Sequence, residues 1–188
     1  MHKNTKNMVL FSDLGGLNEN DIQLIEDKFS RLGIILEKVA FNKEYLNYFE
    51  DFSLQTFYVF SPSFLTGMLN DERGHGVWKS VKAIIAHTQI RLSGKEYVSE
   101  IKGTVTQRSI KFGIHIILDV NTSFNFDLSK IANYRLFNTS LDQILSFLVR
   151  QTPNEKYELP CYVRFSSERK EWTAETFEEY LLRKSKTN

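Results

Sequence analysis

Apolar positions along the first half of the chain follow two different periods. Three short, continuous apolar runs are typical of buried strands, whereas three other segments repeat their apolar residues at helical spacing. The expected strands cover residues 8–12, 34–41 and 54–62, and the expected helices cover residues 22–32, 45–52 and 77–85. Strand and helix therefore alternate through residue 92, which favours a mainly parallel sheet with crossover helices.

Individual residues mark the ends of the first helix. Asn18 or Asn20 is placed to cap its start, because an asparagine side chain accepts a hydrogen bond from a free amide there. Gly33 directly follows the last apolar position, where helices often end in a left-handed conformation that favours glycine. We therefore expect this helix to end at Gly33.

The second half of the chain has a different pattern. Residues 97–106 and 110–120 both alternate apolar and polar positions, as the strands of a half-buried antiparallel sheet do. A hairpin that closes at Gln107–Arg108 places His115 opposite Glu100 and keeps the apolar residues on the other side. We therefore expect these two strands to pair with each other.

Capping patterns predict where the later helices begin. Ser140 and Gln143 have the spacing of a capping box. Near the C-terminus, Thr173 is expected to cap the last helix, with Trp172 and Phe177 in contact across its start.

Together these elements predict an α+β (mixed α/β) fold in a single globular domain, residues 1–188. The first half, residues 1–92, is expected to be βαβαβα-like with a mostly parallel sheet. The second half, residues 93–188, is expected to hold an antiparallel hairpin with packed helices. Residues 184–188 are expected to form a flexible tail.

Charge and cysteine content narrow the classes of function. Lysine and arginine number 24 against 23 acidic residues, the net charge is +1, and the two signs are interleaved. A nucleic-acid partner is therefore not expected. Cys161 is the single cysteine, so an internal disulfide is excluded and a reducing, cytoplasmic location is expected. No apolar stretch approaches the ~20 residues of a membrane-spanning helix, so a membrane location is not expected.

The polar stretch at residues 71–76 is the leading candidate for catalysis. It is expected to be a loop in which His75 lies between two glycines. Asp71 or Glu72 is close enough in sequence to orient His75 as a general base, and Arg73 is adjacent. The alternative is a mobile, solvent-exposed loop without chemistry.

Gly15 and Gly16 form a candidate anion site. They precede a helix start, where free amides and the helix dipole attract anions. The neighbouring acidic residues Asp13, Glu19 and Asp21 would repel a phosphate. A glycine turn between strand and helix is therefore the preferred interpretation.

Glu100, His115 and Lys111 would share the polar face of the expected hairpin. A carboxylate across the ladder would favour the charged form of the imidazole. This face is either the floor of a ligand pocket or the solvated side of an antiparallel sheet.

An aromatic stripe is the third candidate surface. Tyr45, Tyr48, Phe49 and Phe52 fall on one face of a short helix. Such a stripe either joins the core or contacts a subunit or a protein partner, because tyrosine and phenylalanine are enriched in interfaces.

The four histidines lack the spacing of a metal site, so we predict no metal ligands, and no cofactor is identified. We expect a ligand- or protein-binding domain whose partner is a protein or a small ligand, and a homodimer is left open. The alternatives are a small hydrolase or transferase that uses His75 with Asp71 or Glu72, and a structural subunit of a larger assembly.

Overall fold

The computed structural model describes residues 8–39, 54–70, 72–101, 104–119, 122–131, 133–150, 161–175 and 177–186. In chain order the elements are β1 (Met8–Asp13), α1 (Glu19–Arg31), β2 (Ile35–Lys38), β3 (Thr56–Phe60), α2 (Pro62–Asn70), α3 (Glu72–Leu92), β4 (Glu96–Ile101), β5 (Thr104–Ser109), β6 (Phe112–Asp119), β7 (Thr122–Asp127), α4 (Tyr134–Arg150), β8 (Cys161–Ser166), β9 (Glu171–Glu175) and α5 (Phe177–Ser185).

Seven strands form one mixed sheet in the order β2-β1-β3-β6-β7-β8-β9, and β4 and β5 form a separate two-stranded sheet. The ladders β1–β2, β3–β6 and β7–β8 are parallel, and β1–β3, β6–β7 and β8–β9 are antiparallel. Two of the three ladders that the N-terminal strands form are parallel. The predicted α+β class is confirmed.

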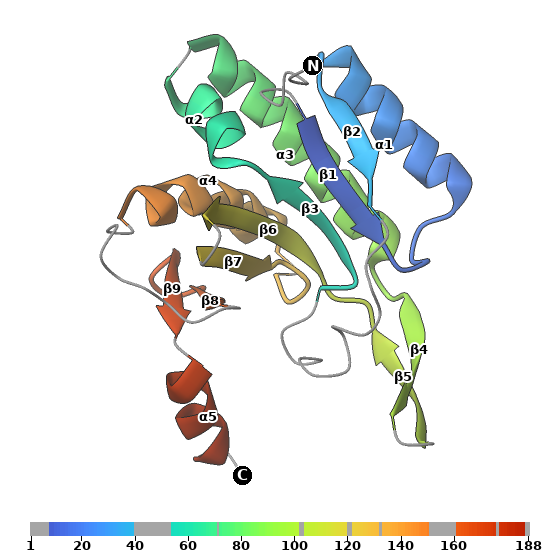
Figure 1. Cartoon of the computed structure of the whole chain (residues 1–188), viewed down its shortest axis with the longest axis vertical. Coiled ribbons are helices and arrows are strands. Elements are labelled where there is room, and N and C mark those ends of the chain that lie inside the picture. The colour runs from blue at the N-terminus through green and yellow to red at the C-terminus, as the bar shows by residue number, and fades with distance from the viewer. Residues whose placement is uncertain are drawn as a thin grey trace.

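Helices α1, α3 and α4 cover one face of the large sheet (Figure 1). The strands turn alternate side chains to this face because the side-chain period of a strand is two. Ile114 and Phe126 are fully buried here together with Ile85 of α3 and Ile144 of α4. Burial of each such side chain stabilises the fold by about 1.5–3 kcal/mol. Among the described helices, none is long and apolar enough to cross a membrane.

The predicted limits of the first helix are confirmed. The Asn18 side chain accepts a hydrogen bond from the Asp21 amide over 2.8 Å and caps α1. Gly33 follows the helix with φ of 71°, in the left-handed region that suits glycine.

The predicted hairpin between residues 97–106 and 110–120 is wrong. β4 pairs with β5, so the hairpin closes between Ile101 and Thr104, and β6 lies between β3 and β7 in the large sheet. Ile114 is opposite Tyr58 on one side and Phe126 on the other. The apolar face of β6 is therefore satisfied by strands that are distant in the sequence.

The β4–β5 hairpin projects from the body of the molecule and is called the arm below (Figure 1). One side of the arm carries Val98 and Val105, whose side chains are 69% and 66% exposed. At its base, the Ile110 amide donates to the Lys95 carbonyl over 3.2 Å, so the chain leaves and rejoins the body at one point.

The predicted capping box is also wrong. α4 begins at Tyr134, six residues before Ser140, and the Asn133 side chain caps it by accepting from the Arg135 and Leu136 amides. Ser140 is buried inside the helix, and its hydroxyl donates to the Phe137 carbonyl over 2.7 Å.

The predicted start of the last helix is displaced. Trp172 and Thr173 lie in β9, and α5 begins at Phe177. Trp172 is 2% exposed, because its ring packs edge-on against Phe126 with the centroids 5.0 Å apart. The position of Trp172 is therefore determined by its burial against the sheet.

Candidate functional site

One end of the large sheet collects polar groups from several strands. Asp13 at the end of β1 is opposite Thr56 at the start of β3, and Thr56 is opposite Phe112 at the start of β6. Asp127 at the end of β7 is opposite Gly113 in the next strand. Open sheets commonly bind ligands at strand ends, where loops supply the side chains. Two cavities lined by residues that the structure describes lie at this end, on either side of the turn that follows β7.

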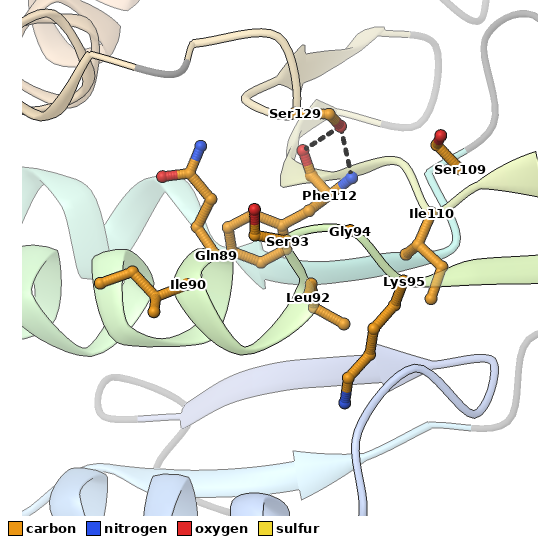
Figure 2. A pocket seen from close by; sticks show the side chains of 10 residues that line it. All are labelled: Gln89, Ile90, Leu92, Ser93, Gly94, Lys95, Ser109, Ile110, Phe112 and Ser129. Atoms are coloured by element: carbon orange, nitrogen blue, oxygen red, sulfur yellow. Dashed lines mark hydrogen bonds between the residues drawn. The ribbon is translucent and has the colours of Figure 1, made fainter.

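The first cavity, called the α3-end cavity, has a volume of about 310 Å³. It lies between the end of α3, the base of the arm and the turn after β7 (Figure 2). Its walls are formed by Gln89, Ile90, Leu92, Ser93, Gly94, Lys95, Ser109, Ile110, Phe112 and Ser129. This volume is at the lower end of the range for small-molecule sites.

The backbone at the end of α3 shapes this cavity. Gly94 has a φ of 76°, so the chain turns sharply after Leu92 in a conformation that suits glycine. The Lys95 amide then donates to the Leu92 carbonyl over 3.0 Å. The turn directs the chain into the arm and leaves a hollow beside it.

Hydrogen bonds fix the wall of the cavity that α3 and the turn after β7 form. The Gln89 side-chain amide donates to the Leu128 carbonyl over 3.1 Å and to the Ile131 carbonyl over 3.0 Å. The Ser129 hydroxyl accepts from the Phe112 amide over 2.7 Å and lies 2.6 Å from the Asp127 carboxylate, to which it donates. α3 and the turn after β7 are therefore joined, and the cavity has fixed walls.

A buried hydrogen bond also fixes α3 on the sheet. The Tyr58 hydroxyl lies 2.6 Å from the Thr88 hydroxyl, which itself donates to the Ile84 carbonyl. Thr88 therefore accepts and Tyr58 donates. Burial raises the pKa of Tyr58, so this phenol stays protonated and keeps its role as donor.

Several polar groups in the α3-end cavity are available to a ligand. The hydroxyls of Ser93 and Ser109 form no hydrogen bond with any residue that the structure describes. Lys95 is the single charged residue among the described residues of the wall, and its ammonium points away from Ser129 to donate to the Gly16 carbonyl over 2.7 Å (Figure 2). The lining residues that the structure describes include no acidic side chain.

The second cavity, called the β8-end cavity, has a volume of about 290 Å³. Its walls come from the turn after β7 and from the end of β8, and they include Asp127, Lys130 and Arg164. The Asp127–Ser129 hydrogen bond separates the two cavities, because Asp127 lines one and Ser129 lines the other.

The candidate anion site at Gly15 and Gly16 already contains a carboxylate. Asp13 accepts from the amides of Gly15, Gly16 and Leu17 over 3.2, 3.2 and 3.0 Å, and from the Thr56 hydroxyl. The loop therefore binds its own carboxylate where a phosphate would bind. A Cβ at Gly16 would also approach the end of the Ile110 side chain to 2.6 Å, so that side chain would have to shift.

The proposed pairing of Glu100 with His115 is wrong, because the two residues lie in different sheets. His115 faces away from the helices, between Ile114 and Ile116, and its Nδ1 lies 2.6 Å from the Asn125 side-chain oxygen. Burial lowers the pKa of His115. Lys111 precedes β6 and lines neither cavity.

The stretch predicted as a catalytic loop is the start of a helix. Glu72, Arg73 and His75 belong to the first turn of α3, and Asp71 lies outside the described residues. The His75 side chain is exposed and lines neither cavity. Gly74 lets α3 pack closely against α2, because a Cβ there would come within 2.6 Å of the Gly67 carbonyl in α2.

The aromatic stripe of Tyr45, Tyr48, Phe49 and Phe52 lies outside the described residues, so it stays a prediction. In the part of the chain that is described, no group of three or more histidine, cysteine, aspartate or glutamate residues is placed to hold a metal ion. Comparison of the chain with protein-family models, with curated proteins and with solved structures finds no match.

Sequence reasoning did not identify the residues of either cavity. Ser93, Ser109 and Ser129 belong to no motif, and they come together only because β6 leaves the arm and joins β3. Gly94 within "SGKE" is a local turn signal after α3, but it does not indicate which serines line the cavity.

Proposed function

We propose that the protein binds a small polar molecule in the α3-end cavity. The observation that carries this proposal is the pairing of free hydroxyls with an apolar floor. Ser93 and Ser109 offer donors and acceptors, while Leu92, Ile110 and Phe112 supply apolar contact. Ligand sites typically combine a mostly apolar wall with a few polar groups that fix orientation.

The chemistry of the wall limits the ligand. Lys95 places a positive charge at the edge of the wall, and the described lining residues include no carboxylate that would attract a cation. Gln89 adds a side-chain carbonyl that accepts hydrogen bonds. A neutral or anionic molecule with hydroxyl or carbonyl groups and one apolar side therefore fits this cavity better than a cation.

A fragment screen by NMR on the whole chain tests this function. We expect binding fragments to shift the amide signals of Ser93, Gly94 and Ser109. Ser93→Leu should abolish these shifts, because the exposed position admits leucine without strain and the side chain fills the cavity. Ser146→Leu, at an exposed position of α4, is the matched control and should leave binding unchanged. A screen in which no fragment perturbs these amides would overturn the proposal.

A second candidate function is self-association through the arm. Val98 and Val105 lie on the same side of a hairpin that is stabilised mainly by its own ladder. An isolated two-stranded hairpin is marginally stable in water, so a second layer or further strands would stabilise it. The β5 sequence has no acidic residue, whereas β4 carries Glu96 and Glu100, so a second copy adds to the β5 edge with less repulsion.

Sedimentation equilibrium over a range of concentrations tests this second function. The wild-type chain should form a dimer, and Val98→Lys combined with Val105→Lys should make it a monomer. Leu182→Lys, which changes an exposed leucine on α5, should leave the dimer intact. A wild-type chain that remains a monomer throughout would exclude the arm as a self-association surface.

A further inference from the structure

The β8-end cavity has a different chemistry from the α3-end cavity. Lys130 and Arg164 both line it, and Ser167 adds a hydroxyl. Its inner wall includes Val163 and Ile131, which are 1% and 8% exposed. Two exposed cations therefore border a small hollow whose inner wall is apolar.

The parallel pairing of β7 with β8 brings these two cations together. Phe126 is opposite Val163, so the turn that follows β7 runs beside the end of β8. Lys130 comes from that turn and Arg164 comes directly after Val163. The two residues are 34 positions apart in the sequence, so only the ladder places them in one cavity.

Neither cation is neutralised by a residue that the structure describes. Lys130 and Arg164 form no ion pair with any residue that the structure describes. The nearest acid in the wall is Asp127, and its Oδ1 already accepts from the Ser129 amide over 2.9 Å and from the Ser129 hydroxyl over 2.6 Å. The formal charge of the wall, from Lys130, Arg164 and Asp127, is +1.

We propose that the β8-end cavity is a binding site for a phosphate group of a small molecule. A guanidinium binds two phosphate oxygens at once, and an ammonium adds a second charge from another direction. The Ser167 hydroxyl is a further donor for the remaining oxygen. The dianionic charge of phosphate matches two cations better than the single charge of a carboxylate.

NMR titration of the full chain with inorganic phosphate, at constant ionic strength, tests the proposal. We expect saturable shifts of the Lys130, Arg164 and Ser167 amides. Arg164→Gln and Lys130→Gln should each weaken binding by about fivefold or more, because each removes a charge-assisted contact. Both side chains are exposed, and the dispersion of the same spectra shows whether each variant is folded.

Lys79→Gln is the matched control, because Lys79 is exposed on α3 and lines neither cavity. It should bind phosphate as the wild-type chain does. An acetate titration separates phosphate recognition from general attraction of anions. The proposal is overturned if phosphate gives no saturable shift, if acetate binds equally well, or if Lys79→Gln weakens binding as much as Arg164→Gln.

Discussion

The indole N–H of Trp172 in β9 donates to the backbone carbonyl of Ser140 in the middle of α4, over 2.7 Å. Both partners are buried, and the bond joins the last strand of the sheet to the helix that covers it. Trp172→Phe removes this bond and leaves a buried carbonyl without its side-chain donor. We expect the free energy of unfolding to fall by about 1–3 kcal/mol. Chemical denaturation measures this change.

Trp78 provides a matched control for that experiment. It is also buried, and its ring packs edge-on against Phe60, but its N–H has no hydrogen-bond partner in the structure. Trp78→Phe removes an unsatisfied donor. Its loss in the free energy of unfolding should therefore be smaller than that of Trp172→Phe by about 1 kcal/mol or more. Equal losses in the two variants would show that the bond to Ser140 contributes nothing beyond packing.

Gly113 should tolerate no side chain. A Cβ there would overlap the backbone carbonyl of Phe126 in the neighbouring strand and touch Leu54 at 3.0 Å. Because a backbone atom cannot move aside cheaply, we expect Gly113→Ala to lower the free energy of unfolding by about 2 kcal/mol or more.

Gly76→Ala is the opposite case for a thermal or chemical denaturation experiment. Gly76 is exposed inside α3, and a Cβ there meets no atom within 4 Å. Alanine should raise the free energy of unfolding by about 0.5–1 kcal/mol, because it restricts the unfolded chain. Destabilisation by this substitution would contradict a regular helix at the start of α3.

The Asp13 carboxylate should be essential to the loop that follows β1. Asp13→Ala leaves the three loop amides and Thr56 without their acceptor, and we expect a loss of about 2–4 kcal/mol of stability. Asp142→Asn is the surface control, because Asp142 is half exposed and its described ion pair is with Lys82. This variant should lose about 0–1 kcal/mol in the free energy of unfolding.

The same Asp13→Ala variant exposes an anion site. Once the carboxylate is gone, the amides of Gly15, Gly16 and Leu17 point at an open space that formate or phosphate can enter. Added formate should therefore raise the melting temperature of Asp13→Ala more than that of the wild-type chain. An identical response of both proteins would rule out rescue by the anion.

His115 should make the protein less stable in mild acid. Burial lowers its pKa below the ordinary value of 6.5, so the unfolded chain takes up a proton at a higher pH than the folded chain. The free energy of unfolding therefore falls as the pH drops from 6.5 to the folded pKa, by at most about 1.4 kcal/mol per pH unit for one group. His115→Asn removes this contribution and should give a shallower decline.

Asn125→Ala tests the cause of that shift. The hydrogen bond that His115 donates to the Asn125 side-chain oxygen raises the pKa of His115 and so opposes the effect of burial. Its removal should lower the pKa of His115 further and extend the loss of stability to lower pH. NMR titration of the imidazole gives the pKa directly, and a value above 6.5 in the wild-type chain would contradict this account.

Local signals in the sequence predicted both ends of α1 but not the starts of α4 and α5. Asn18 and Gly33 limit α1 because a cap needs only a side-chain acceptor at one end and a left-handed residue at the other. The alternation in β6 was also recognised. Alternation fixes which face of a strand is buried but not which strand lies beside it, so residues 97–106 were chosen as its partner in place of β3 and β7.

Glycines misled the sequence interpretation in a different way. Gly74 and Gly76 indicated a loop, yet Gly74 serves the close packing of α3 against the Gly67 carbonyl. Only the packed structure distinguishes a glycine that bends the chain from a glycine that makes room. The same limit applies to the cavities, because Gln89 and Ser129 meet through packing alone.

The hydrogen bond from Ile110 to Lys95 closes the chain on itself at the base of the arm. Residues 96–109 are therefore an insertion between α3 and β6, and none of the seven strands of the large sheet lies within them. A short turn between Lys95 and Ile110 would join α3 to β6 and leave all seven strands of the sheet in register. The outer part of the arm can therefore change in length without disturbing the sheet, whereas Ser109 at its base also lines the α3-end cavity and ties that part of the arm to the body.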